Sequence, residues 1–259
     1  MVILGINDVS FRYTDRPVLQ HISFDIQSGE FIGLAGPNGS GKTTLLRILV
    51  NLLHPTSGSI ELDGIPLSRY PRQKLARRIA FVPQEHHAEF PFSVLEIVLM
   101  GRTPYLNNFG FERDEDFDIA HQMMKVMDIE HLASHAIADI SGGERQRAFL
   151  ARALVQEADI LLLDEPNAHL DIGHQIGIFS ILKSLTSKKP STVIFVVHDL
   201  NLASLFSQRI ALLHNGILEA IGKPEDVLTQ QIISRVFSTD VTIDRHPSFN
   251  APRVTVLPR

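Results

Sequence analysis

Continuous apolar runs alternate with helical patterns along this chain. The runs at Phe31–Ala35, 160–163 and 193–197 contain no polar side chain. Runs of this kind are typical of parallel strands that helices cover on both faces. The pattern therefore predicts an α/β fold with a mainly parallel sheet at its core.

The first 35 residues show a different pattern, in which apolar and polar residues alternate. Val9, Phe11 and Tyr13 follow this period, and it repeats over residues 22–26. A period of two indicates strands with one exposed face, so we expect an N-terminal antiparallel β subdomain. Asp63-Gly64 and Asn215-Gly216 are predicted to be hairpin turns, because such pairs accept positive φ angles.

Helical signals dominate residues 85–153. Ser93 is a candidate N-cap, and Glu96 three residues later completes a capping box for a helix over 93–101. Residues 102–113 are predicted to form a loop, followed by a helix from Asp114 to Met127. That helix is expected to bury one apolar face, made of Phe117, Ala120, Met124 and Met127.

These patterns divide the chain into three parts. Residues 1–84 and 154–240 are predicted to form the α/β core with its antiparallel β subdomain. Residues 85–153 are predicted to form a helical subdomain inserted into that core. Residues 241–259 are polar and interrupted by proline, so we expect a loosely packed tail or small appendage.

Composition narrows the classes of protein that remain. The 259 residues carry a formal net charge of -5, which argues against a protein that coats nucleic acid. The chain has no cysteine, which fits a reducing compartment. No apolar run approaches the roughly 20 residues of a membrane helix, and the first residues do not resemble a signal peptide. We therefore expect a soluble cytoplasmic protein that reaches a membrane only through a partner.

A complete phosphate-binding motif follows the apolar run at Phe31–Ala35 and precedes a helical stretch. It consists of Gly36, Pro37, Asn38, Gly39, Ser40, Gly41, Lys42, Thr43 and Thr44. Its glycines allow successive backbone N–H groups to point at one anion, and the helix N-terminus adds to that field. Lys42 is expected to reach the β- and γ-phosphates and Thr43 to ligate Mg²⁺. The alternative, a glycine-rich turn that matches by chance, is disfavoured by the flanking strand and helix.

Two further stretches carry groups suited to nucleotide chemistry. Asp164 and Glu165 follow the run at 160–163, at the end of a parallel strand where ligands bind. We expect Asp164 to hold Mg²⁺ and Glu165 to orient and deprotonate the attacking water. Ser141-Gly142-Gly143 opens a helix and offers a second anion site, although a Ser-capped helix after a glycine turn would look the same.

In order and approximate spacing, these motifs resemble those of the ATP-binding cassette (ABC) ATPases. The resemblance implies that residues 36–44 are the Walker A element and residues 141–143 the ABC signature. Asp164 would then be the Walker B aspartate and Glu165 the catalytic glutamate. The resemblance implies four further roles: Gln84 as the Q-loop glutamine that links Mg²⁺ and the attacking water to the helical insert, Asp171 as the D-loop aspartate, His198 as the switch histidine at the γ-phosphate, and Tyr13 as the aromatic residue on adenine.

Some residues depart from the family pattern or have simpler interpretations. Ile140 stands where leucine is usual, and Asn167 stands where threonine is common, so we expect no D-loop contact there beyond Asp171. Taken alone, Gln84 could be a solvated loop residue and His198 a capping or core histidine. Tyr13 alone could be a strand-packing aromatic.

The resemblance also implies partners. Two copies would stack head to tail, each ATP lying between the Walker A element of one copy and the signature of the other, with ATP and Mg²⁺ as cofactors. The segment Met100-Gly101-Arg102-Thr103-Pro104-Tyr105 resembles one common in the ATPases of bacterial importers for iron-siderophores, haem and vitamin B12 (cobalamin). Two copies would then dock on a polytopic permease at the cytoplasmic face of the membrane, through residues near 86–112. A substrate-binding protein would act indirectly, and this subunit would not touch the cargo.

Two alternatives stay open. The same machine could serve zinc, manganese or molybdate, because the cargo leaves no chemical trace in this subunit. A non-transport ABC ATPase that acts on the ribosome or on nucleic acid is the other class. The single cassette and the acidic balance disfavour that class, so no nucleic-acid partner is expected.

Overall fold

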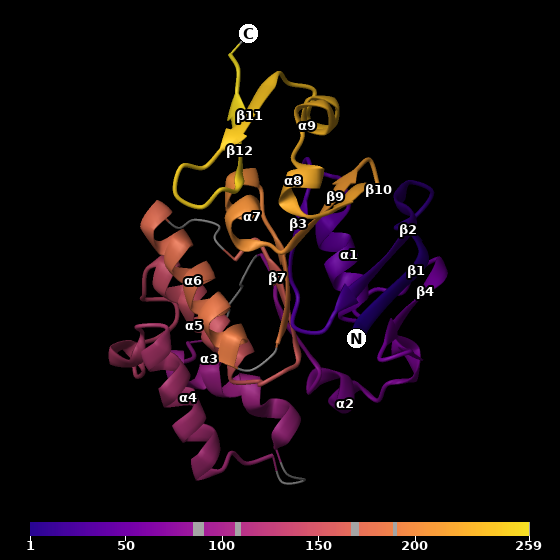
Figure 1. Cartoon of the computed structure of the whole chain (residues 1–259). Coiled ribbons are helices and arrows are strands. Elements are labelled where there is room, and N and C mark those ends of the chain that lie inside the picture. Colours follow the sequence, from indigo (N-terminus) through magenta and orange to yellow (C-terminus); the bar gives the residue numbers. More distant parts are fainter. Residues whose placement is uncertain (85–90, 107–109, 167–170, 189–190, 259) are drawn as a thin grey trace. The chain divides into compact units, whose positions relative to one another are not determined.

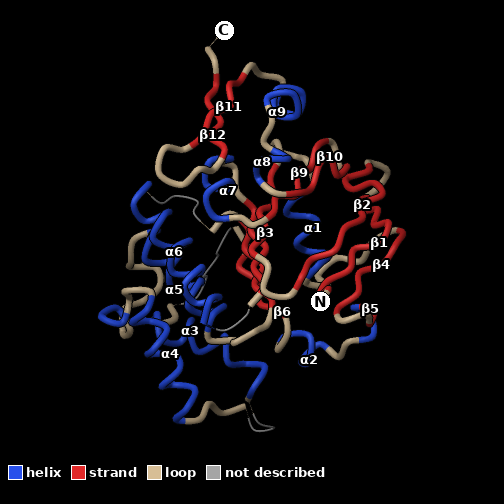
Figure 2. The backbone as a smooth tube through the Cα atoms, viewed as in Figure 1, coloured by secondary structure: helices blue, strands red, loops and turns tan. Residues whose placement is uncertain are grey.

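The computed structural model describes residues 1–84, 91–106, 110–166, 171–188 and 191–258 (Figure 1). These residues divide into two compact units. The first unit comprises Met1–Arg69 and Lys189–Arg259, and the second comprises Tyr70–Lys188. Figure 2 shows that strands make up much of the first unit, whereas helices predominate in the second.

The elements of the first unit, in chain order, are β1 (Val2–Arg12), β2 (Pro17–Gln27), β3 (Phe31–Ala35), α1 (Lys42–Leu49), β4 (Ser57–Leu62), β5 (Ile65–Pro66), η1 (Leu67–Arg69), β8 (Thr192–Val196), α7 (Leu200–Phe206), β9 (Arg209–His214), β10 (Ile217–Gly222), α8 (Pro224–Val227), α9 (Gln230–Phe237), β11 (Val241–Arg245) and β12 (Pro252–Val256). The elements of the second unit are α2 (Arg72–Ala76), β6 (Ile79–Val82), α3 (Val94–Leu99), η2 (Met100–Tyr105), α4 (Asp114–Val126), η3 (Glu130–Leu132), α5 (Gly142–Leu154), β7 (Ile160–Asp164) and α6 (Ile172–Lys188). The label η marks a 3₁₀ helix.

Two kinds of sheet occur in the first unit, as the sequence patterns predict. Strands β2, β1, β4 and β5 form an antiparallel sheet in that order. Strand β3 lies between β8 and β9 and is parallel to both, and β10 pairs with β9 in the antiparallel sense. Every residue of β3 and β8 is buried, which explains the continuous apolar runs at 31–35 and 193–196.

The hairpin turn between β9 and β10 follows the predicted chemistry. Asn215 and Gly216 have φ angles of 49° and 79°. Two positive φ angles in succession belong to a type I′ turn, whose twist matches that of the flanking strands.

The C-terminal residues form a β-hairpin on α7, where the sequence suggested a loosely packed tail or small appendage. The side chain of Asn201 makes two hydrogen bonds to β12. Its Nδ2 donates to the carbonyl of Val254 at 3.2 Å, and its Oδ1 accepts from the Val254 N–H at 2.8 Å. Ser204 Oγ donates to the carbonyl of Pro252 at 2.6 Å. Figure 1 shows the hairpin beside α7. These contacts fix its position in the first unit.

Among its described residues, the second unit contains five α-helices and a parallel strand pair. Strands β6 and β7 are parallel, with Val82 opposite Leu163. Helix α3 starts with the predicted capping box: Ser93 Oγ accepts from the Glu96 N–H, and a Glu96 carboxylate oxygen accepts from the Ser93 N–H. The box fixes where this helix begins.

One predicted helix face and one predicted loop are partly wrong. On α4, Ala120, Met124 and Met127 are buried, but Phe117 is 39% exposed and Asp116 is fully buried instead. The period of apolar residues along the helix cannot show this exchange, because the buried Asp116 carboxylate pairs with Arg102, which lies outside the helix. The predicted loop at 102–113 begins within a 3₁₀ helix, η2.

None of the helices in the described residues combines the length and the apolar character that crossing a bilayer requires.

Two glycine substitutions test the packing of the second unit. A Cβ at Gly101 would overlap the carbonyl oxygen of Arg152, whereas a Cβ at Gly177 meets nothing within 4 Å. We expect Gly101→Ala to lower the free energy of unfolding by about 1–3 kcal/mol, as overpacking does. Gly177→Ala should leave it unchanged or raise it by up to about 1 kcal/mol, because alanine favours the helix. Denaturant unfolding measures both, and equal effects of the two substitutions would contradict this packing.

Candidate functional site

The phosphate-binding motif forms the connection between β3 and α1 in the first unit. Gly36, Gly39 and Gly41 have φ angles of 144°, 77° and 102°, which other residues rarely adopt. A Cβ at Gly36 would also overlap the carbonyl oxygen of Leu213 on β9. The loop conformation therefore requires glycine at these positions, and it delivers the chain to the N-terminus of α1.

The loop offers polar groups to an anion. Lys42 is buried, and its Nζ donates to the carbonyls of Gly36 and Pro37, each at 2.9 Å. Ser40 Oγ is buried and lacks a hydrogen-bond partner among the described residues. Helix α1 begins after Gly41 without a side-chain cap. A buried unpaired hydroxyl beside an uncapped helix N-terminus fits a phosphate, which would satisfy both. Asn38 and Gly39 are exposed, while Thr43 is half-buried and Thr44 is buried.

Two other predicted site residues belong to the same unit. Tyr13 comes directly after β1 and is 55% exposed, with its ring edge-on to Phe11 at 4.9 Å between centroids. Its ring therefore packs against β1 and also presents an exposed surface. His198 is exposed and follows β8, and Asp199 next to it caps α7 by accepting from the N–H groups of Asn201 and Leu202. Exposure of His198 excludes the core histidine of the simpler interpretation, and Asp199 is the N-cap of α7.

The second unit brings Gln84 and Glu165 together. Because β6 and β7 are parallel, their carboxyl ends lie at the same edge. Gln84 Nε2 donates to Glu165 Oε2 at 2.9 Å across that edge. Asp164, the last residue of β7, is buried, whereas Glu165 has a φ angle of 51° that turns the chain out of the strand. The two carboxylates at the end of β7 therefore lie in different environments.

The signature residues start α5 in the same unit. Ser141 is its N-cap and forms a capping box with Glu144: Ser141 Oγ accepts from the Glu144 N–H at 3.3 Å, and Glu144 Oε2 accepts from the Ser141 N–H at 2.9 Å. Hydrogen bonds from the Ser141 side chain, and then from its backbone, lower the pKa of Glu144. Ser141 and Gly142 are exposed, Gly143 is half-buried, and nothing lies within 4 Å of a Cβ placed on Gly142. The start of α5 is thus capped by its own side chains and exposed to solvent.

A contact that no local sequence pattern reveals joins α5 to the residues that follow β7. Gln146 is buried, and its Nε2 donates to the carbonyl of Pro166 at 3.0 Å. The signature helix is therefore joined to the residue that follows Glu165. Only the position of Gln146 inside the signature stretch hinted at a role, and no local pattern shows its partner.

Asp171 caps the start of α6. Its Oδ1 accepts from the His174 N–H at 2.9 Å, and its Oδ2 lies 2.8 Å from His174 Nδ1. These hydrogen bonds, the backbone one first, lower the pKa of Asp171. The carboxylate is exposed and so available to a partner as well. Asn167, which belongs to the same predicted stretch, lies outside the described residues.

Comparisons with known proteins agree with this set of motifs. The sequence profile of the family described as ABC transporter matches residues 19–168. A hemin import ATP-binding protein of Nocardia farcinica is 40% identical over 92% of this chain and 82% of its own length. A probable siderophore transport system ATP-binding protein of Bacillus subtilis is 35% identical over 97% and 92%. A solved metal-chelate type ABC transporter in an inward-facing conformation has a similar chain, with a TM-score of 0.86, 29% identity and coverage of 99% of this chain and 98% of that one.

The capping box at Ser141 makes a prediction about protonation. Because its hydroxyl favours the ionised carboxylate, Ser141→Ala should raise the pKa of Glu144 toward its ordinary value. The capping box therefore stabilises α5 at pH values above the ordinary pKa of a glutamate. This stabilisation is lost as the pH falls through the lowered pKa of Glu144. Carboxyl NMR shifts followed through a pH titration measure this change. Ser93→Ala, which removes the matching cap of α3, should alter the titration of Glu96 and leave Glu144 unchanged. A Glu144 titration unaffected by Ser141→Ala would contradict the prediction.

Proposed function

The chain belongs to the ABC transporter family and is one of its ATPases, and from this premise we propose that it drives a membrane importer for metal chelates such as iron-siderophores, haem or cobalamin. The observation that carries the proposal is the similarity to hemin and siderophore import subunits over more than nine-tenths of this chain. The similarity to a metal-chelate type transporter over nearly the full length supports the same class of cargo.

In this proposal the first unit binds the nucleotide. The N–H groups of the loop at 36–41 and the N-terminus of α1 hold the phosphates, as the uncapped helix and the unpaired Ser40 hydroxyl suggest. Lys42 exchanges its two loop carbonyls for phosphate oxygens. Tyr13 offers an exposed ring for stacking on adenine, and His198 contacts the γ-phosphate.

The second unit supplies the groups for hydrolysis. Glu165 accepts the proton of the attacking water, and Gln84, already hydrogen-bonded to it, orients that water. Mg²⁺, when bound, neutralises charge on the β- and γ-phosphates. The donors that fit this ion are the oxygens of Thr43, Gln84 and Asp164, since hard cations prefer oxygen ligands.

We propose that the working form is a twofold dimer. Ser141-Gly142-Gly143 has the exposed helix N-terminus that a γ-phosphate from a second copy requires. Asp171, also exposed, would contact the same partner. Because a twofold axis makes the two sites equivalent, ATP binding closes both and hydrolysis opens both. Solved cassettes that are 30% identical to this chain are described as dimers.

Replacing the proposed base tests the chemistry. Glu165→Gln should lower kcat for ATP hydrolysis by roughly 10²–10⁴, because an amide cannot accept the proton. ATP should then hold the variant as a dimer, which size-exclusion chromatography with light scattering detects. Glu225→Gln, a matched change in the first turn of α8, should leave both properties unaltered. Near-normal turnover of Glu165→Gln would remove Glu165 from the mechanism.

Capture of the partner tests the transporter assignment. The tagged Glu165→Gln chain is added with ATP and Mg²⁺ to membranes of the source organism in mild detergent, and mass spectrometry identifies what is retained. We expect a stoichiometric polytopic permease, placing this subunit at the cytoplasmic face of the membrane. Its substrate-binding protein then reports the cargo: binding of iron-siderophore, haem or cobalamin supports the proposal, and binding of zinc, manganese or molybdate replaces it. Ribosomal proteins or nucleic acid without a permease would contradict the transport role.

A further inference from the structure

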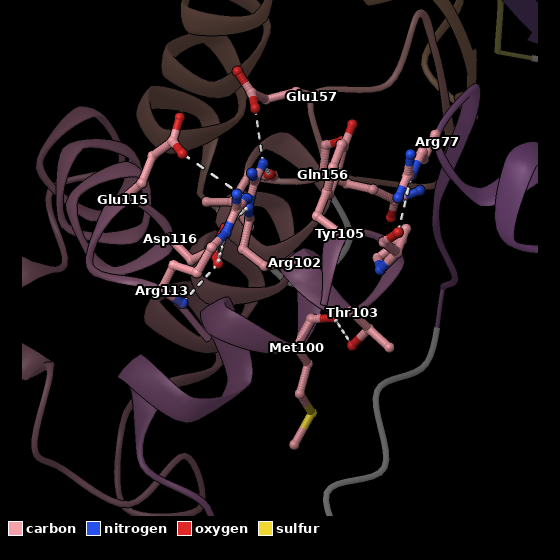
Figure 3. A network of polar contacts seen from close by, with 12 residues as sticks. Arg77, Met100, Arg102, Thr103, Tyr105, Arg113, Glu115, Asp116, Gln156 and Glu157 are labelled. Carbon is pink, nitrogen blue, oxygen red and sulfur yellow. Dashed lines mark hydrogen bonds and ion pairs between the residues drawn. The ribbon is translucent and has the colours of Figure 1, made fainter. Parts of the chain in front are cut away.

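An arginine is buried in the second unit on the short helix η2. The side chain of Arg102 is only 3% exposed. Its Nε donates to Asp116 Oδ1 at 2.8 Å, and its Nη1 donates to the carbonyl of Val155 at 2.7 Å and to Glu157 Oε2 at 2.8 Å (Figure 3). A buried cation persists only when it is fully paired, so these contacts fix η2 in the unit.

Two of these three contacts lie at the C-terminal end of the signature helix α5. Val155 is the C-cap of α5, where carbonyl groups lack helical partners and a positive charge is favourable. Tyr105 OH adds a hydrogen bond to the carbonyl of Gln156 at 3.0 Å. Gly101 packs so closely on Arg152 that a Cβ would overlap its carbonyl oxygen. Helix η2 is thus joined to α5 at the opposite end from Ser141.

The same short helix is held from its other side by α2. The carbonyl of Pro104 accepts hydrogen bonds from Gln73 Nε2 at 3.0 Å and from Arg77 Nε at 2.9 Å. The guanidinium carbons of Arg77 and Arg102 lie 5.0 and 4.2 Å from the centroid of the Tyr105 ring. Cation–π attraction therefore adds to the hydrogen bonds (Figure 3).

The third contact ties η2 to the start of α4. Asp116 is fully buried, and its second carboxylate oxygen accepts from the Arg113 N–H at 2.9 Å. Burial alone would raise the pKa of Asp116, but hydrogen bonds from the Arg113 backbone and the Arg102 guanidinium lower it below its ordinary value. The Arg102–Asp116 contact is therefore an ion pair that stabilises the subdomain without touching α5.

One face of η2 remains on the surface, where Met100 is 37% exposed and Thr103 is exposed. We propose that Arg102 and Tyr105 are positioning residues that transmit a push on η2, from the permease, to the C-terminal end of α5 and through that helix to Ser141-Gly142-Gly143. This inference rests on the proposed transport function. Helix α5 is about 20 Å long at 1.5 Å per residue, and as a continuous helix it moves as one piece.

Three variants distinguish a coupling role of the Arg102 and Tyr105 contacts from a role in stability alone. Tyr105→Phe removes only the hydrogen bond to Gln156 and keeps the ring. Arg102→Lys keeps the charge but cannot reach Asp116, Val155 and Glu157 together. Asp116→Asn weakens the ion pair on the α4 side and leaves the α5 contacts in place. Arg235→Lys, on α9 and paired with Glu219 of β10, is the control outside the network.

The measurement is the ratio of ATPase rates with and without the captured permease, together with the thermal midpoint and the amount of permease retained. We expect Arg102→Lys to lower this ratio at least fivefold and Tyr105→Phe two- to threefold, with permease retention unchanged. Asp116→Asn should lower the thermal midpoint more than Tyr105→Phe yet keep the ratio. The Arg235→Lys control should match the unaltered chain.

Other outcomes overturn the coupling role, except that a variant that fails to fold passes the decision to another. If the ratio falls in proportion to the thermal midpoint across the variants, the network is structural only. If Arg102→Lys fails to fold, Tyr105→Phe decides, and an unchanged ratio in that variant overturns the coupling role while the transporter assignment stands. If the unaltered chain retains no permease, both the coupling role and the proposed function fail.

Discussion

The first unit depends on one electrostatic constraint, the need for negative charge at the start of α1. The loop at 36–41 uses three glycines with positive φ angles to reach that helix, which begins without a side-chain cap. Lys42 meanwhile binds carbonyls of its own loop, and Ser40 keeps a buried hydroxyl without a partner among the described residues. A phosphate satisfies all of these groups together, so nucleotide binding is the role that this part of the fold favours most.

The second unit is subject to a different constraint: the charges and amides that are buried in it must be paired. Helix α5 serves as its common element. Near its N-terminus, Gln146 binds the carbonyl of Pro166, next to the proposed base Glu165. At its C-terminus, Arg102 binds the carbonyl of Val155. A helix held at both ends can transmit a displacement from a surface contact to the signature residues, whereas a loop in the same place would absorb that displacement.

The sequence predicted those parts of the fold whose signals are local. The phosphate loop, the Asn215-Gly216 turn and the capping box at Ser93 each depend on a few neighbouring residues, and the continuous apolar runs mark β3, β7 and β8. The sequence did not predict the buried Arg102–Asp116 pair, because Arg102 looks like a loop residue until α4 and the end of α5 surround it. The sequence did not predict the Gln146–Pro166 and Asn201–Val254 contacts for the same reason. The first joins residues 20 positions apart and the second joins residues 53 positions apart, so no local pattern reveals either.

In the proposed dimer, one copy's phosphate loop meets the other copy's signature across ATP. The chain contains no cysteine, so any disulfide in a mixture of chains with single cysteines at Asn38 or at Gly142 joins two introduced cysteines. Both positions are exposed, and a disulfide requires their Cα atoms to come within about 7 Å. Mixing Asn38→Cys and Gly142→Cys chains in the Glu165→Gln background should give a cross-linked dimer of unlike chains with ATP and almost none with ADP. Equal cross-linking with either nucleotide, or none with ATP in chains that bind it, would contradict the account.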